Sequence, residues 1–129
     1  MERFLHKFSP YLYVILRILA GLMFAMHGCQ KLFGWPGSRP ALPVASFMGL
    51  AGVVEFFGGL MIAFAILTSY AAFIASGEMA VAYFMAHAPQ GALPIVNKGE
   101  LAVLYCFLFL YIAAHGSGLW SVDALTRKK

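Results

Sequence analysis

Residues 11–33 read YLYVILRILAGLMFAMHGCQKLF, an apolar run that contains two charged side chains, Arg17 and Lys31. A helix that crosses the hydrocarbon core of a bilayer needs about 20 predominantly apolar residues, so this run predicts a transmembrane helix. Further apolar segments follow at residues 46–67, 70–87 and 100–116. We therefore predict an all-α integral membrane four-helix bundle that forms a single transmembrane domain over residues 1–129.

The composition favours the same class of protein. Of the 129 residues, 62% are hydrophobic and 11% are charged, whereas an ordinary soluble domain carries about 25% charged residues. These values exclude a disordered chain and an ordinary soluble domain. The formal net charge of +4 comes from basic residues at the ends of the apolar runs. Because they form no basic patch with interleaved aromatic residues, we expect the lipid bilayer as a partner and not nucleic acid.

The connections and the basic residues predict the topology. Prolines break residues 34–43 and 88–99 into loops, while Thr68 and Ser69 mark a tight helical hairpin between the second and third segments. The basic residues near the termini are Arg3, Lys7, Arg127, Lys128 and Lys129, against Lys31, Arg39 and Lys98 near the loops. Both termini should therefore be cytoplasmic. A cleaved signal peptide is the alternative for the first segment, but Arg17 within that segment argues against it.

Six ionisable residues in or beside the apolar segments are the candidate site residues: Arg17, His27, Lys31, Glu55, Glu78 and Glu100. Each charge costs roughly 2.5–3.5 kcal/mol at the centre of a membrane helix, so these side chains should face inward. A period of 3.6 residues places them beside small residues, Gly21 and Gly28 in the first segment and Gly52 and Gly59 in the second. Small residues allow neighbouring helices to approach closely.

Counting along the helices gives a ladder of charges across the membrane. We predict that Arg17 pairs with Glu78, either as an ion pair that fixes helix register or as part of a site. We also predict that Lys31 pairs with Glu100, close to His87 at the outer rim. Glu55 then has no dedicated cation, and its carboxyl is expected to be protonated or to share a proton with His27. His27 and Glu55 are accordingly the candidate catalytic residues.

Four short stretches in order resemble one family. The string RILAGLMFAMHGCQKLFG at residues 17–34 resembles the first-helix signature of the DoxX family of small bacterial membrane proteins. The stretches EFFGG at residues 55–59, NKGE at residues 97–100 and GSGLWSVD at residues 116–123 agree with the same family. The resemblance covers nearly the whole chain. Its pattern points to Arg17, His27, Lys31, Glu55 and Glu100 without assigning them chemical steps.

The resemblance implies a four-helix bundle in the bacterial inner membrane with an oxidoreductase-linked role. Relatives have been linked to the transfer of electrons to quinone and to membrane complexes with redox and thiol-stress enzymes. A haem ligated by His27 and His87 is disfavoured, because a lone spacing match is weak evidence for axial ligation. Cys29 and Cys106 point away from the polar face and are expected to be buried, inert thiols. The sequence contains no metal-binding motif.

Three functions remain open at this point. The first is an oxidoreductase or oxidoreductase-complex subunit that binds quinone or a small redox molecule at His27, Lys31 and Glu55, with electrons supplied by a soluble or membrane redox partner. The second is a non-enzymatic membrane anchor that holds a soluble redox or stress-response enzyme. The third is a proton-linked permease for a small solute, which the ladder of charges suggests and which would require a homo-oligomer.

Overall fold

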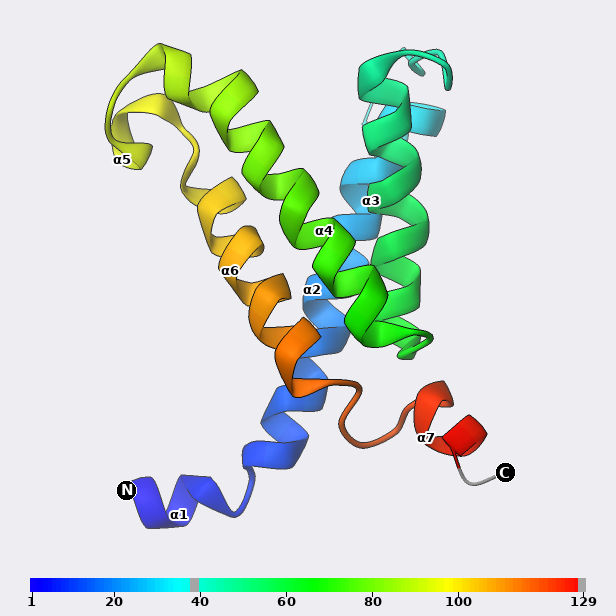
Figure 1. Cartoon of the computed structure of the whole chain (residues 1–129), viewed down its shortest axis with the longest axis vertical. Coiled ribbons are helices and arrows are strands. Elements are labelled where there is room, and N and C mark those ends of the chain that lie inside the picture. The colour runs from blue at the N-terminus through cyan, green and yellow to red at the C-terminus, as the bar shows by residue number, and fades with distance from the viewer. Residues whose placement is uncertain (38–39, 128–129) are drawn as a thin grey trace.

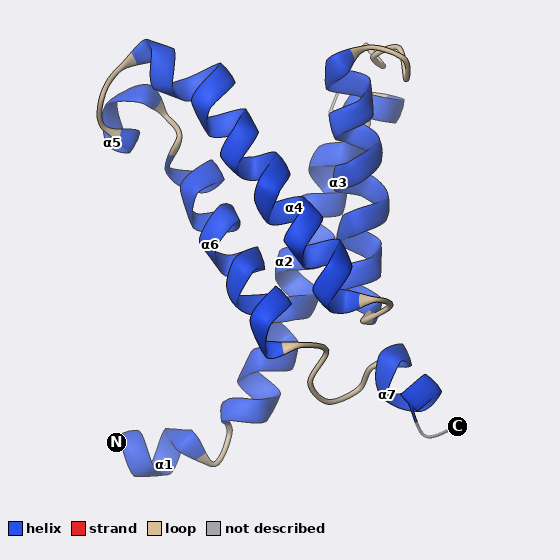
Figure 2. Ribbon diagram, in the orientation of Figure 1, coloured by secondary structure: helices blue, strands red, loops and turns tan. Residues whose placement is uncertain are grey.

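The computed structural model describes residues 1–37 and 40–127, and every regular element in this part of the chain is a helix (Figure 2). The helices are α1 (Glu2–His6), α2 (Ser9–Phe33), α3 (Phe47–Phe64), α4 (Thr68–Ala82), α5 (Pro94–Asn97), α6 (Glu100–His115) and α7 (Val122–Arg127). A π-helical turn (Tyr83–His87) and a 3-10 turn (Ala88–Gln90) follow α4. The prediction of an all-α fold is confirmed. Arg39, Lys128 and Lys129, which entered the prediction of topology, lie outside the described residues.

The four long helices coincide with the four apolar segments, and local signals explain their ends. Pro10 lies in the first turn of α2, where its missing N–H costs nothing, and Gly34 ends the helix in the left-handed conformation with φ 70°. Ser46 caps α3 by accepting a hydrogen bond from the Gly49 N–H at 3.0 Å. α4 is shorter than predicted, because the chain leaves α-helical geometry after Ala82 and continues to His87 as the π turn.

The long helices form two close pairs, α2 with α3 and α4 with α6, and α3 also contacts α4. In Figure 1 the two pairs diverge toward the end that carries α5, while both chain termini lie at the opposite end. We call these the loop end and the terminal end. Glycines allow the contact between α2 and α3, since a Cβ atom at Gly21 would lie 2.6 Å from both Ala63 N and Gly59 O. The prediction that small residues bring helices close together is confirmed.

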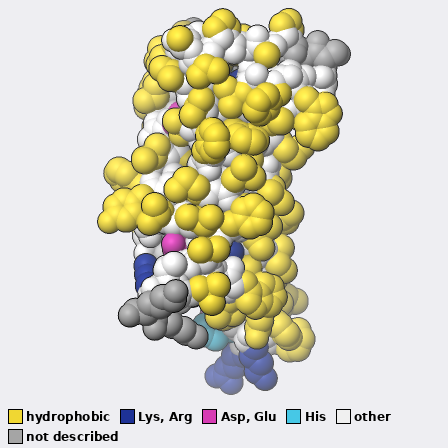
Figure 3. Space-filling model, turned by 90° about the vertical axis from the view of Figure 1, so that its right-hand side faces the viewer, with side chains coloured by type: hydrophobic (Ala, Val, Ile, Leu, Met, Phe, Trp, Pro, Cys, Tyr) yellow, Lys and Arg dark blue, Asp and Glu magenta, His cyan; other side chains and the backbone are white. Residues whose placement is uncertain are grey.

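The middle of the interior is apolar, and the outside is apolar over most of its height. Phe24, Ile62 and Phe109 are almost fully buried, with exposed fractions of 1%, 0% and 0%. Large apolar side chains nevertheless project outward from each long helix, as they would toward lipid; examples are Leu19, Phe57, Phe73 and Phe107. Figure 3 shows such side chains covering most of one face, with basic residues gathered near the terminal end. By length and composition, α2 and α3 can each cross a membrane.

Candidate functional site

An ion pair between Lys31 and Glu55 lies at the centre of the candidate site. The Lys31 ammonium donates to Glu55 Oε1 at 2.6 Å, and the Glu55 side chain is only 3% exposed. The prediction that Lys31 pairs with Glu100 is therefore wrong, as is the prediction that Glu55 has no dedicated cation. The reason is the backbone contact at Gly28, which brings α2 against Gly52 and Phe56 of α3. Glu100 lies exposed in the first turn of α6.

Two further oxygen-bearing side chains approach this ion pair from the other helix pair. The Glu78 carboxyl on α4 lies against Glu55 and within the electrostatic field of Lys31. Tyr105 on α6 is 5% exposed and interacts electrostatically with Glu55. Within the described residues, Glu55 Oε2, Glu78 Oε2 and the Tyr105 hydroxyl are buried without a hydrogen-bond partner. Buried polar atoms are rarely left unpaired, because each costs about 1–3 kcal/mol, so these oxygens should pair with one another through a proton or with a polar ligand.

A cavity of about 140 Å³, which we call the inner cavity, lies between the two helix pairs beside these groups. Its lining residues come from all four long helices and are Phe24, His27, Lys31, Glu55, Met79, Ala82, Leu101, Ala102 and Tyr105. His27, Lys31 and Glu55, predicted as one cluster, thus lie together. The cavity can hold a ligand the size of one substituted six-membered ring, with a polar wall on one side and apolar walls on the other.

His27 lies between the inner cavity and a second cavity of about 330 Å³ that we call the vestibule. The vestibule is lined by His27, Gln30, Lys31, Pro40, Leu42 and Met48. The His27 ring meets the Tyr105 ring edge to face, with centroids 6.3 Å apart. His27 is therefore beside the carboxyl that we predicted as its proton-sharing partner, although Lys31 makes the hydrogen bond to Glu55.

Arg17 lies away from this cluster, at the terminal end of the interior. Its guanidinium is fully buried and donates to main-chain carbonyls of Ala63 at 3.5 Å, Leu119 at 3.4 Å, Trp120 at 3.2 Å and Ser117. The prediction that Arg17 pairs with Glu78 is wrong. The prediction considered only carboxylates as partners for Arg17. In the structure, the loop after α6 folds back and supplies main-chain carbonyl oxygens in their place. Arg17 thus holds the C-terminal segment against α2 and α3.

At the loop end, His87 contributes to loop structure. His87 Nδ1 lies 3.1 Å from the Asn97 carbonyl, and the Asn97 amide donates to the Tyr83 hydroxyl at 3.2 Å and to the Gly91 carbonyl at 3.0 Å. Asn97 is fully buried, so its side chain is part of the packing that joins residues 88–99 to the helices.

Tyr105 and Asn97 are the residues that sequence reasoning missed. Tyr105 was detectable, because Ala102, Tyr105, Phe109 and Ile112 repeat at a helical spacing that predicts the buried face of α6. Both cysteines are free, and Cys106 Sγ lies 3.6 Å from Ser76 Oγ. Among the residues with described positions, no group of three His, Cys, Asp or Glu side chains could hold a metal ion.

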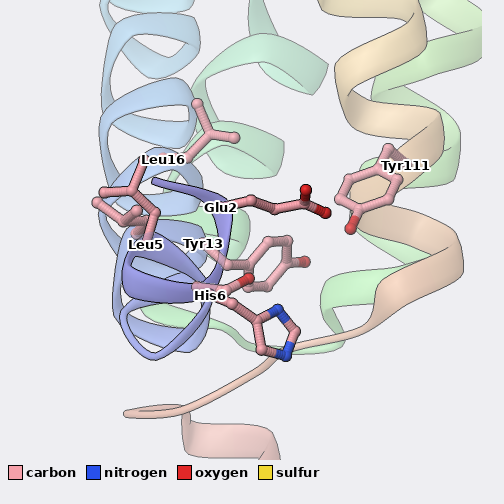
Figure 4. A pocket seen from close by; sticks show the side chains of 8 residues that line it. Glu2, Leu5, His6, Tyr13, Leu16 and Tyr111 are labelled. Carbon is pink, nitrogen blue, oxygen red and sulfur yellow. The ribbon is translucent and has the colours of Figure 1, made fainter.

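A larger cavity of about 450 Å³ lies at the terminal end, beneath α1 (Figure 4). It is lined by Glu2, Leu5, His6, Ser9, Leu12, Tyr13, Leu16 and Tyr111. The figure shows the Glu2 carboxylate directed toward the Tyr111 ring. The predicted site residues lie elsewhere, so this cavity is separate from the candidate site. The His115 ring packs against the Tyr13 ring, with centroids 3.9 Å apart and ring planes tilted by 31°.

Comparison with known proteins identifies the family. Residues 12–88 match the family model named DoxX. An uncharacterized protein of Haemophilus influenzae is 41% identical, covering 97% of this chain and 98% of its own length. Inner membrane protein YqjF of Escherichia coli is 32% identical over 90% of this chain and 92% of its own. Uncharacterized membrane protein Rv3486 of Mycobacterium tuberculosis is 29% identical, covering 98% and 88%.

No solved structure matches the chain. The family match confirms the resemblance to DoxX and covers two of the four sequence stretches, at residues 17–34 and 55–59. This chain is a membrane protein and belongs to the DoxX family.

Proposed function

We propose that the protein crosses the bacterial inner membrane four times, with both termini in the cytoplasm. The common position of the termini supports an even number of crossings (Figure 1). α4 has 15 residues and the π turn adds 5, which together reach the length of about 20 that a crossing needs. Tyr11 and Trp120 pack together at the terminal end with centroids 5.9 Å apart, where an interfacial aromatic belt is expected.

We further propose that the inner cavity binds the headgroup of a quinone or a similar small redox molecule. The observation that carries this proposal is the Tyr105 hydroxyl, which is buried without a partner in the wall of a cavity that also meets the Lys31–Glu55 ion pair. A quinone carbonyl can accept a hydrogen bond from the Tyr105 hydroxyl or from His27. A hydroxyl of the reduced form can donate to Glu55 or Glu78. The cavity of about 140 Å³ suits one ring, so an isoprenoid tail would lie outside it among lipid chains.

In this proposal the chain supplies binding groups and protons, while a redox partner supplies or removes the electrons. The sequence carries no motif for a bound electron carrier, and a cofactor-dependent reaction needs one. Lys31, Glu55 and Glu78 can hold or release a proton as the charge of the bound headgroup changes. The protein then acts as the membrane component of an oxidoreductase system.

Quinone binding to the purified protein tests the proposal. A short-tailed ubiquinone analogue is titrated into protein in lipid nanodiscs and followed by calorimetry. Tyr105→Phe should weaken binding by about tenfold, the effect of one lost hydrogen bond of about 1.4 kcal/mol. Tyr111→Phe is the matched control, because Tyr111 lies on the same helix and is 57% exposed. Equal affinities for the two variants and the wild type would refute the proposal.

A membrane subunit that holds a redox enzyme is the second candidate. It is favoured by exposed apolar side chains around α5, where Leu93, Ile95 and Val96 are 61%, 75% and 63% exposed. Under this alternative, Ile95→Asp should abolish co-purification of the enzyme, whereas the double replacement of Glu55 by Gln and His27 by Leu should retain the partner. Loss of the partner in both variants would argue against a pure anchoring role.

A further inference from the structure

The inner cavity and the vestibule share a wall made by His27 and Lys31. The vestibule lies between the C-terminal part of α2 and residues 40–48, toward the loop end. The Leu42 N–H donates to the Lys31 carbonyl at 2.7 Å and holds this segment beside the shared wall. The Lys31 side chain therefore borders the vestibule while its ammonium contacts Glu55 in the inner cavity.

The interior is closed on the opposite side of the inner cavity. Phe24 and Phe109 pack with ring centroids 4.7 Å apart, and Ile62 is fully buried beside the same core. These residues lie nearer the terminal end than Glu55 on α3 and Tyr105 on α6. Within the part of the chain that the structure describes, these packed apolar side chains lie between the carboxyl groups and the terminal end, and they offer no polar partners for water.

The charges around Glu55 indicate that one of the clustered carboxyl groups carries a proton, which can exchange with water. From α2, α4 and α6, the groups that face Glu55 are Lys31, His27, Glu78 and Tyr105. One ammonium balances one carboxylate. Two adjacent carboxylates beside a single cation in an apolar interior cannot both stay ionised without a large cost, so the Glu55 and Glu78 carboxyls together hold one proton.

We infer that this proton enters and leaves through the vestibule, past His27 and Lys31, so that the site equilibrates with the loop end and not with the terminal end. The inference rests on the proposed role of the inner cavity in binding and proton exchange. It adds the side from which protons reach the site. Whatever the ligand, the protonation of the two carboxyl groups follows the pH on one side of the membrane. In the proposed topology that side is the periplasm.

Cysteine accessibility tests the route. In a background with Cys29→Ser and Cys106→Ser, Ala102→Cys places a thiol in the wall of the inner cavity. A small, membrane-impermeant cationic thiol reagent is added to intact cells and, separately, to inverted membrane vesicles. We expect modification from the loop end alone. Met48→Trp, which fills the vestibule, should slow it several-fold, and Phe109→Ala, which opens the apolar core, should create a second route from the terminal end.

Ala72→Cys is the control, because Ala72 is fully buried in the core toward the terminal end and should resist the reagent from both sides. Modification of Ala102→Cys from the terminal end, or insensitivity to Met48→Trp, would overturn the inference. These outcomes are independent of quinone titration. A protein that binds no quinone but shows one-sided labelling would refute the proposed ligand and leave the route standing.

Infrared spectroscopy tests the shared proton separately. The protonated carboxyl band of the purified protein should disappear in both Glu55→Gln and Glu78→Gln and persist in Glu100→Gln, whose carboxyl is exposed. A wild-type spectrum without this band, or a band lost in only one of the first two variants, would contradict the shared proton on which the inference depends.

Discussion

The Lys31–Glu55 ion pair determines the charge and the polarity of the candidate site. Its distance of 2.6 Å and the burial of Glu55 place a close, partly desolvated interaction between the two helices of one pair, with the Lys31 side chain 23% exposed. A buried pair of this kind is costly to break, because removal of one partner leaves an uncompensated charge in the interior. The remaining carboxyl oxygen of Glu55 is still available to a ligand, since its only described hydrogen bond is made through Oε1.

We predict that Lys31→Met destabilises the folded protein by about 3–5 kcal/mol, the usual cost of stranding one member of a buried pair. The double variant with Glu55→Gln should recover most of this loss, because the buried charge is removed with its partner. Thermal unfolding in detergent measures both effects. Glu100→Gln is the control for loss of an exposed carboxylate and should change stability little. A double variant that is as unstable as Lys31→Met would contradict the assignment.

At the residue scale, the inward positions were predictable and the pairings were not. Lys31 and Glu55 share helix faces with glycines, and the cost of exposing a charge to lipid predicts that both face inward. Their pairing depends on the stagger of α2 against α3 and on the reach of the lysine side chain, which helical periodicity does not contain. The partners of Arg17 were also unpredictable from the sequence. They are main-chain carbonyls, which every residue has, so no residue type marks their positions.

At the scale of elements, the contact between α2 and α3 depends on glycine. A Cβ atom at Gly59 would lie 2.5 Å from both Ala25 N and Gly21 O, whereas a Cβ at the neighbouring Gly58 would meet nothing within 4 Å. These two adjacent positions on one helix provide a matched comparison between backbone contact and open space. The ion pair depends on the same contact, since it forms across this pair of helices.

Gly59→Ala should therefore destabilise the protein by about 1–3 kcal/mol through overpacking. Gly58→Ala should be neutral or stabilising by up to about 1 kcal/mol, because alanine is the better helix former. Unfolding midpoints of the two variants in the same detergent give the comparison. Similar losses for both would mean that helix propensity, and not backbone contact, dominates at these positions.

The C-terminal segment is fastened to α4 by Asp123. Its carboxylate accepts hydrogen bonds from the Leu67 N–H at 2.7 Å, the Thr68 N–H at 2.9 Å and the Thr68 hydroxyl at 2.8 Å. Partial burial opposes ionisation of this carboxyl, but the hydrogen bonds from Thr68 and Leu67 and the charge of Arg127 outweigh it and lower the pKa below its ordinary value of 3.8. Asp123 thus acts as a helix cap contributed by a distant part of the chain.

Asp123→Asn should cost about 1 kcal/mol, as is typical for loss of a capping carboxylate. Because the folded-state pKa lies below that of the unfolded chain, the stabilisation is present above about pH 4 and is lost as the pH falls through the folded-state pKa. The unfolding midpoints of the variant and the wild type should therefore converge in acid. A difference that stays constant or grows as the pH is lowered would contradict the role of the ionised carboxylate.

The long helices were predictable because each follows an apolar run, and local signals mark several of their ends, such as Gly34 for α2, Ser46 for α3 and Gly99 for α6. The capping of α4 by Asp123 was not, since it joins residues separated by 55 positions in the chain. The π turn after Ala82 was also missed, because the apolar pattern runs on to His87 while the backbone geometry changes within it.

At the scale of the whole molecule, the arrangement of helices and exposed apolar side chains supports the four-crossing topology. In a cysteine-free background, Ala92→Cys in the loop before α5 should react with an impermeant reagent in intact cells. Ala124→Cys in α7 should react only in inverted vesicles. Labelling of both positions from the same side would contradict the proposed topology, while the interior contacts would remain as described.

The buried Arg17 guanidinium has a consequence for the energetics of the host membrane. Carbonyl dipoles from four residues solvate it, and the Asp123 carboxylate interacts with it electrostatically, so the terminal end of the interior holds a fixed, solvated cation. Water channels use a fixed arginine in this way to repel protons. In the proposed topology, this fixed cation would oppose the passage of protons between the inner cavity and the cytoplasm.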